Sequence, residues 1–151
     1  MKTVIQRVKY ASVTIEEEVH GKINQGYMIL VGIKNEDTPE IVSRMADKIA
    51  NLRIFEDADG KMNLNLSQAG GAVLSISQFT LYADCHKGNR PSFDTAGEPK
   101  HAKDMYILFN KDMREKGFQV EEGIFGADMK VELLNDGPVT IILDSDIDIR
   151  H

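Results

Sequence analysis

Polar residues interrupt an apolar stretch in the middle of the chain, at Ser77-Gln78-Phe79-Thr80-Leu81. The run from Ala72 to Tyr82 has the composition of a buried strand, so we predict that Gln78 and Thr80 lie side by side on one face of it. A buried hydroxyl or amide without a hydrogen-bond partner costs roughly 1 to 3 kcal/mol. These groups are therefore either satisfied within the fold or kept for a ligand near the strand end, and the residue types alone favour the first interpretation.

A second unusual stretch, Asn135-Asp136-Gly137-Pro138-Val139-Thr140, separates two strand-like segments at 130–134 and 139–143. Asn-Asp-Gly already has the composition of a turn, and the following proline constrains the backbone further and removes a ladder donor. We predict a turn between two strands. About 5 to 6% of X-Pro bonds in folded proteins are cis, and the sequence alone leaves the isomer of Gly137-Pro138 open.

Other catalytic signatures are absent. There is no phosphate-binding G-x-x-x-x-G-K, no G-x-G-x-x-G after a strand, no H-E-x-x-H and no nucleophile elbow. Cys85 is the only cysteine, which excludes an intramolecular disulfide and a cysteine-based zinc site. A nucleophilic Cys85 would need a base, and adjacent side chains generally point apart, so we expect a loop cysteine. We expect no metal and no cofactor, because the histidines lack ligand spacing: His20, His86, His101 and His151.

The elements around these stretches predict an α+β fold. Gly26 to Ile33 is a continuous apolar run of strand length, so it should be a strand buried on both faces near the sheet centre. A helix should begin at Thr38-Pro39-Glu40, and a second should run from about Lys100 to Lys116. Further strands are expected at 3–8, 12–19, 52–56, 72–82, 130–134 and 139–143, with a turn at 20–22.

The number of strands is high for a chain this short. Short turns favour antiparallel neighbours, so we expect a curled, barrel-like and mostly antiparallel sheet with the two helices packed on one side. The chain has 151 residues and 42% hydrophobic content, which fits a single domain over residues 1–151. Its longest uncharged apolar run, Tyr27 to Ile33, is far shorter than the roughly 20 residues that cross a bilayer. We expect no membrane contact and a cytoplasmic location.

A net charge of −6 argues against a protein that coats nucleic acid. A local basic surface is nevertheless predicted in and beyond the long polar connection from Asp84 to Pro99, which carries Lys87 and Arg90 and is followed by Lys100 and Lys103. Loops of this length are often functional, so it is the first place to expect a substrate contact. The alternative interpretation is a solvated loop, and the sequence favours neither.

Together, SQFTL at 77–81 and NDGPVT at 135–140 resemble the paired signature motifs of the D-aminoacyl-tRNA deacylase family. The similarity covers essentially the whole chain in order. It extends to shorter stretches: QRV at 6–8, ASVT at 11–14, GKMNLN at 60–65 and RPSF at 90–93.

The resemblance implies an enzyme of chiral proofreading that hydrolyses the ester bond of D-aminoacyl-tRNA, and of glycyl-tRNA, at the tRNA acceptor end. It also implies a homodimer in which a cis Gly137-Pro138 enters the active site of the partner and excludes an L side chain with its backbone carbonyls. Discrimination by exclusion needs no pocket fitted to any one side chain.

The resemblance also assigns the site residues. The N–H of Phe79 or Thr80 is the candidate oxyanion donor, Ser77 and Gln78 hold the terminal adenosine or the aminoacyl group, and Asn135 belongs to the substrate-binding set. Arg7 supports the Gly-Pro segment. No base lies beside Thr80 in the sequence, so we interpret Thr80 as a positional catalytic residue and not as a nucleophile. The ribose hydroxyl of the substrate is an alternative activator of water.

Two functions of other classes remain as alternatives. A non-catalytic RNA-binding dimer would use the basic segment at 86–103, but the acidic net charge and the lack of aromatics interleaved on a basic strand count against it. A general esterase would need a Ser-His-acid arrangement, for which the sequence offers no catalytic histidine. Composition and periodicity alone support only an α+β domain whose polar strand residues are satisfied internally.

Overall fold

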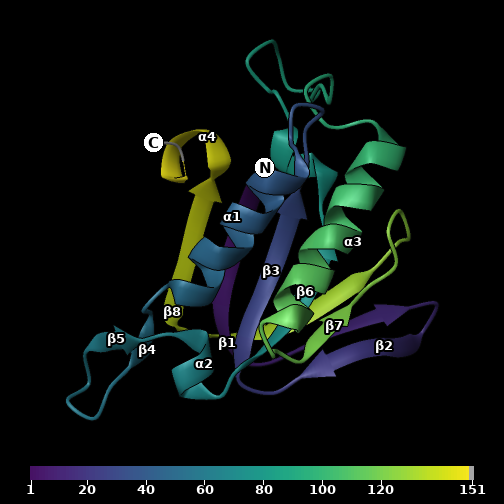
Figure 1. Ribbon diagram of the computed structural model, residues 1–151. Helices are drawn as coiled ribbons and strands as arrows, with labels where there is room; N and C mark the ends of the chain where they lie inside the picture. The colour runs from purple at the N-terminus through teal and green to yellow at the C-terminus, as the bar shows by residue number, and fades with distance from the viewer. Residues whose placement is uncertain (150–151) are drawn as a thin grey trace.

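The computed structural model describes residues 1–149, so His151 lies outside the described residues. Helices α1 (Pro39–Asn51) and α3 (Pro99–Glu115) pack on one face of a curled sheet (Figure 1). The other elements are β1 (Lys2–Ile15), β2 (Glu18–Ile23), β3 (Gly26–Gly32), β4 (Phe55–Glu56), β5 (Met62–Leu64), α2 (Leu66–Ala69), β6 (Ala72–Ser77), the 3-10 turn η1 (Phe79–Tyr82), β7 (Val120–Glu122), β8 (Lys130–Asp144) and α4 (Ser145–Asp148).

The main sheet is mixed, and its centre is β3. Strand β1 pairs antiparallel with β2, β3 and β8, whereas β3–β6 and β6–β7 are parallel. The sheet nearly closes on itself where β2 reaches β7. At this point His20 Nδ1 of β2 lies 2.9 Å from the carbonyl oxygen of Glu122 of β7. The predicted α+β class and the barrel-like, mostly antiparallel sheet are confirmed. Strand β3 lies between β1 and β6 and is almost entirely buried, as its apolar run predicted.

The N-terminal third differs from the prediction of two strands and a turn at 20–22. One long strand, β1, runs from Lys2 to Ile15, and residues 20–22 lie inside β2. The chain instead reverses at Glu16 and Glu17, which adopt φ values of 50° and 69°. Neither residue is a type that favours this left-handed conformation. The turn was missed because its position is set by the pairing of β1 with β2 and not by local composition.

The C-terminal part also corrects a prediction, because no turn separates two strands at 135–138. Strand β8 continues from Lys130 to Asp144 and pairs with β1 on both sides of this segment. The register shifts between Gln6 and Ala11, so the segment bulges from the ladder without ending it. The expected strand at 52–56 is also shorter, since only Phe55 and Glu56 pair, as β4.

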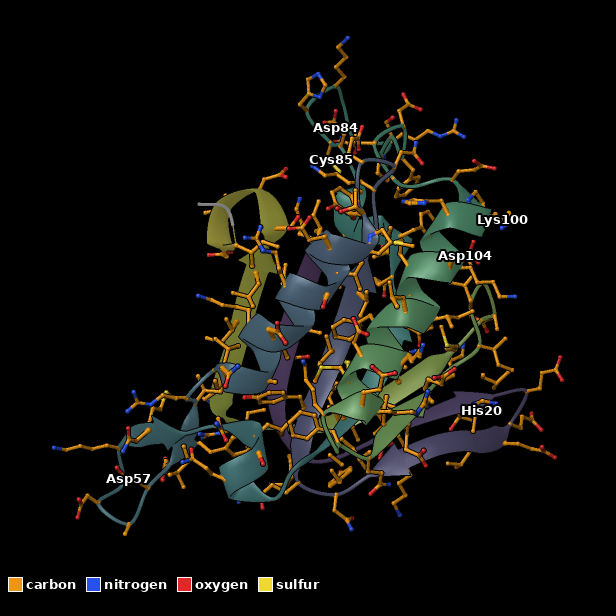
Figure 2. The ribbon with its side chains drawn as sticks, in the orientation of Figure 1. His20, Asp57, Asp84, Cys85, Lys100 and Asp104 are labelled. Carbon is orange, nitrogen blue, oxygen red and sulfur yellow. The ribbon has the colours of Figure 1, made fainter. Side chains whose placement is uncertain are left out.

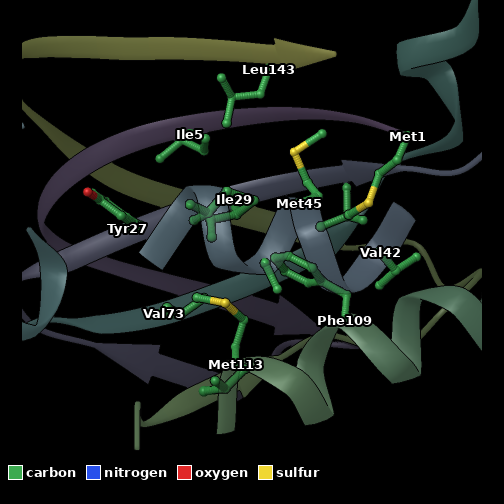
Figure 3. Packing of buried hydrophobic residues seen from close by; sticks show 14 of the residues in the cluster. Met1, Ile5, Tyr27, Ile29, Val42, Met45, Val73, Phe109, Met113 and Leu143 are labelled. Atoms are coloured by element: carbon green, nitrogen blue, oxygen red, sulfur yellow. The ribbon is translucent and has the colours of Figure 1, made fainter. Parts of the chain in front are cut away.

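The larger hydrophobic cluster lies between the sheet and the two long helices (Figure 3), and a second cluster, which includes Val13, Met28 and Leu74, is formed by strand residues alone. The predicted start of α1 is confirmed, since the Thr38 hydroxyl accepts a hydrogen bond from the N–H of Ile41 at 3.3 Å. In α3, Phe109 and Met113 are fully buried, and Gly117 follows its end with φ of 95°. Within residues 1–149, none of the helices combines the length and apolar character needed to span a bilayer.

Candidate active site

The predicted site at 77–81 lies where β6 ends. The expected strand to Tyr82 is wrong beyond Ser77, because the backbone turns at Gln78 into the 3-10 turn η1. The N–H of Gln78 still donates to the carbonyl of Val31 at 2.8 Å, which ties the start of the turn to β3. Parallel strands need no hairpin at this end, so β6 can leave the sheet here and place polar groups beyond its edge.

Gly32 allows η1 to pack closely on the end of β3. A side chain at Gly32 would bring its Cβ within 3.0 Å of Leu81 Cβ and 3.2 Å of the Gln78 carbonyl. The turn changes the relation predicted for the two polar side chains: Gln78 Nε2 donates to Thr80 Oγ1 at 2.5 Å across the turn, not along a strand face. Gln78 is half-buried and Thr80 is exposed.

A cavity of about 520 Å³ opens beside this turn. Three of the predicted site residues line it, namely Ser77, Gln78 and Phe79, whereas Thr80 does not. The other walls come from the start of α3, from the connection between β7 and β8, and from the strands beneath: Ile76, Gly97, Pro99, Ala102, Phe125, Gly126, Ala127, Asp128, Met129 and Val131. The cavity is mainly apolar with a polar edge, which suits a ligand that carries an aromatic base or side chain and one polar reacting group.

The backbone of η1 carries two N–H groups at the edge of the predicted site. The N–H groups of Phe79 and Thr80 stand at the start of the 3-10 turn, where the turn itself supplies no acceptor. Such donors are fixed in place before a substrate binds, so they can stabilise a developing oxyanion without reorganisation. Within residues 1–149, no three His, Cys, Asp or Glu side chains gather closely enough to hold a metal ion.

The second predicted segment is anchored firmly while its tip is exposed. Asn135 Nδ2 donates to the carbonyls of Arg7 (3.1 Å) and Val139 (2.9 Å) and so closes the bulge. Buried Arg7 donates from Nε to the Asp136 carbonyl at 3.0 Å. The peptide bond before Pro138 is cis, and both Gly137 and Pro138 are exposed.

Arg7 ties this segment to the core. Its Nη1 donates to the carbonyl of Ile54 at 2.7 Å, and its Nε lies 3.6 Å from Asp136 Oδ2. Opposite Arg7 on β3, Tyr27 is fully buried and stacks on Phe55. Burial raises the pKa of the Tyr27 phenol, and the neighbouring guanidinium acts in the opposite direction. The phenol therefore stays neutral beside the cation.

One chain does not bring its two predicted motifs together. The turn η1 packs on Gly32, which pairs with Lys2 of β1, whereas the Gly-Pro segment packs on Arg7, five residues further along the same strand. At about 3.4 Å per residue, the two motifs lie about 17 Å apart along β1. The cavity of one chain is therefore lined by Ser77, Gln78 and Phe79 but not by its own Gly137-Pro138.

Sequence reasoning missed the cavity wall formed by the connection between β7 and β8. The glycines of this connection were the one local sign of a constrained loop. The structure shows why glycine is needed there: Gly126 has φ of 81°, and a Cβ on Gly123 would lie 2.3 Å from Met129 Sδ. These positions fix a tight loop. What the sequence could not show is that this loop faces the end of β6, since 45 residues separate Phe79 from Phe125.

Two solved structures share this fold. A solved structure described as a probable eukaryotic D-amino acid tRNA deacylase has the same fold, with a TM-score of 0.84 over 94% of this chain and 97% of that one, at 14% identity. A second solved structure, a c-Myc DNA unwinding element binding protein, is 41% identical with a TM-score of 0.89 and covers 95% of this chain and 98% of that one.

Sequence relatives are closer still. A D-aminoacyl-tRNA deacylase of Brevibacillus brevis is 59% identical over 96% of this chain and 100% of its own length. One of Thermus aquaticus is 57% identical over 96% of this chain and 95% of its own. The family model of D-Tyr-tRNA(Tyr) deacylase matches residues 4–144. The chain belongs to the D-Tyr-tRNA(Tyr) deacylase family, whose activity is hydrolysis of the ester bond of D-aminoacyl-tRNA.

Proposed function

We propose that this chain hydrolyses the ester of D-aminoacyl-tRNA in the cavity at the end of β6, in the cytoplasm, and that a second copy of the chain supplies the Gly137-Pro138 segment that rejects L-esters. The observation that supports this most is the separation of the two motifs. Ser77, Gln78 and Phe79 line a cavity that the chain's own Gly137-Pro138 does not reach, and that segment is rigidly held yet exposed.

The surface around the Gly-Pro segment supports a homodimer. Within residues 1–149, strand β8 pairs with β1 and leaves its other edge unpaired, and its outward face carries Leu134 and Ile142, which are 49% and 66% exposed. Large exposed apolar side chains in line on an edge strand are typical of an interface. A symmetric dimer through this strand would use the same surface on both copies and would carry both Gly-Pro segments toward the partner.

Hydrolysis of the ester requires little more from the protein than a correctly positioned substrate and a backbone N–H that donates to the oxyanion. Water attacks the ester carbonyl, and the carbonyl oxygen becomes an oxyanion that accepts hydrogen bonds from the N–H of Phe79 or Thr80. Collapse of the tetrahedral intermediate breaks the bond to the ribose oxygen, which takes a proton and leaves as the hydroxyl of tRNA. In this proposal the neighbouring ribose hydroxyl activates the water. Asp128 also lines the cavity, but its carboxylate is paired with Lys130 at 2.9 Å.

Chirality is read by exclusion in this proposal. The carbonyls of Gly137 and Pro138 of the partner copy crowd the alpha-carbon of the bound aminoacyl group, so a D side chain points to solvent and an L side chain clashes. Asn135 and Arg7 hold this backbone in place in the copy that supplies it. Glycine has no side chain, so glycyl-tRNA escapes the filter and is hydrolysed too.

The direct test compares D-tyrosyl-tRNA with L-tyrosyl-tRNA at low enzyme concentration. Release of the D-amino acid with the L-ester untouched is the expected result. Equal rates on both esters would contradict exclusion by the Gly-Pro segment and point to a general esterase. Absence of turnover on either ester would contradict the enzymatic proposal as a whole.

The role of Thr80 can be tested separately. Its hydroxyl accepts from Gln78 and lies outside the cavity, so Thr80→Ala should lower kcat/KM for D-tyrosyl-tRNA by about fivefold, the value of one hydrogen bond. Thr80→Ser, which keeps the acceptor, should behave as the wild type. Near-normal turnover of Thr80→Ala would remove even the positional role, whereas a loss of several orders of magnitude would make Thr80 the nucleophile.

Nucleic-acid binding without turnover is a second candidate, favoured by the name of the 41% identical solved structure. The net charge of −6 counts against extensive contact with a duplex. Salt-dependent binding of a DNA duplex with no ester hydrolysis would favour this second function over the first.

A further inference from the structure

We propose that the loop tip at residues 85–91 binds the phosphate backbone of the tRNA acceptor stem through Lys87 and Arg90. This inference rests on the proposed function, since it assigns the surface on which the body of that substrate lies. It concerns residues outside the cavity and outside the Gly-Pro segment.

The tip is a structured projection. Asp84 and Ser92 exchange two backbone hydrogen bonds of 2.8 Å, which close the seven residues between them into a loop. The Thr95 hydroxyl donates to the Tyr82 carbonyl at 3.1 Å and fixes the returning strand of the loop. Figure 2 shows Asp84 and Cys85 where this loop leaves the body of the molecule, beyond the ends of the strands.

Charge is concentrated on the tip. Lys87 and Arg90 are exposed, and neither has an ion-pair partner within residues 1–149. No acid lies between Asp84 and Asp94, and the Asp84 carboxylate is itself engaged by the backbone N–H and ring of His86, which lowers the pKa of Asp84. The tip at 85–91 thus carries two cations and no acid, with Asp84 and Asp94 flanking it, on a protein with a net charge of −6.

The loop is joined to the mouth of the cavity. Phe93, just after the tip, packs edge-on against Phe79, with 5.0 Å between ring centroids, and Phe79 lines the cavity. Gly97, further along the same connection, also lines the cavity, and its N–H donates to the Ile33 carbonyl at 2.8 Å. In this proposal a nucleic acid whose last nucleotide enters the cavity leaves past Phe79 and Phe93, so its next phosphates pass the cationic tip.

Phosphate is the partner that this chemistry fits. Lys and Arg side chains that are exposed, flexible and unpaired bind phosphate oxygens without reading sequence. An editing enzyme that meets many tRNAs needs this kind of contact. Lys103 is exposed on α3 and follows Ala102, which lines the cavity, whereas Lys100 is paired with Asp104 at 3.0 Å.

The test uses the double variant Lys87→Ala/Arg90→Ala of the full chain. Binding of uncharged tRNA should weaken by roughly tenfold, and the slope of log Kd against log salt should fall by about one to two. The KM for D-tyrosyl-tRNA should rise by a similar factor with kcat unchanged. Hydrolysis of D-tyrosyl adenosine, which has the ester but no stem, should stay at the wild-type rate.

The matched control is Lys22→Ala/Lys61→Ala, which removes two exposed cations on β2 and on the hairpin of β4 and β5, away from the loop (Figure 1). It should leave tRNA binding and its salt slope unchanged. An unchanged slope in Lys87→Ala/Arg90→Ala, or an equal loss on D-tyrosyl adenosine, would overturn the proposal. Because binding is measured with uncharged tRNA, a wild type without turnover would refute the proposed function and still test this surface.

Discussion

Replacing Gly137 by alanine is expected to lower kcat/KM for D-aminoacyl-tRNA by roughly 100-fold. Gly137 has φ of 134°, and a Cβ there would lie 2.7 Å from Val139 Cγ2 and 2.9 Å from the Val139 nitrogen. Both contacts are closer than real Cβ atoms allow, so the backbone at 136–138 must move. In the proposed site the carbonyls of this segment lie against the alpha-carbon of the bound ester, so moving them also misplaces the D-ester, and a misplacement of about 1 Å costs on the order of 100-fold in rate.

The control for backbone strain alone is Gly60→Ala. Gly60 also has a positive φ, of 76°, but no atom lies within 4 Å of the position its Cβ would take, and it sits in the turn between β4 and β5. Its activity should match the wild type. If Gly137→Ala retained full activity and full discrimination against L-tyrosyl-tRNA, the Gly-Pro segment would have no part in the site.

Mixing two impaired variants tests whether the segment acts across a dimer. Gly137→Ala keeps an intact cavity, and Gln78→Ala keeps an intact Gly-Pro segment. A mixed dimer with sites shared across subunits contains one complete site, so activity should reappear on mixing after dissociation and reassociation. Activity that stays at the level of the separate variants would show that each site is made by one chain.

Replacing Asp37 by alanine is expected to give the largest loss of stability, about 3 kcal/mol at pH 6. Asp37 is 2% exposed and binds the Met1 ammonium at 2.5 Å through Oδ1 and the Lys34 N–H at 2.8 Å through Oδ2. The same ammonium donates to Ser145 Oγ at 2.8 Å. Removal of the carboxylate leaves a buried cation without its counter-charge, and the loss is measured by urea unfolding.

The pH dependence of this loss has a defined sign. Burial lowers the pKa of the Met1 amino group below 8.0, and the Asp37 hydrogen bond opposes the shift. Between the folded pKa and 8.0 the unfolded state holds more protons, so this group makes stability rise with pH through that window. The loss in Asp37→Ala should therefore shrink at pH 9, where the amine is neutral in both states.

The control is Asp104→Ala, which removes an exposed pair with Lys100 on the surface of α3. Exposed pairs contribute about 0 to 1 kcal/mol, so its stability should change little at either pH. A loss in Asp37→Ala no larger than that of Asp104→Ala would show that the buried ammonium does not need its carboxylate.

Local chemistry made several elements predictable. The apolar run of β3, the Thr38 cap of α1 and the range of α3 each depend on residues close in sequence, and the structure confirms them. Elements that depend on distant partners were not predictable in the same way. The end of β6 at Ser77 is decided by the close packing of η1 on Gly32, and the continuity of β8 is decided by its ladder with β1.

The family and its two motifs could be predicted without a structure, because short runs of residues with fixed spacing carry both. The folded chain was needed to show that SQFTL forms a turn at a cavity and that the 125–129 loop makes another wall of it. It was also needed to show that the Gly-Pro segment of the same chain lies about 17 Å away along β1. The reason is physical: strand register and close packing join residues far apart in the chain, and no local pattern carries that information.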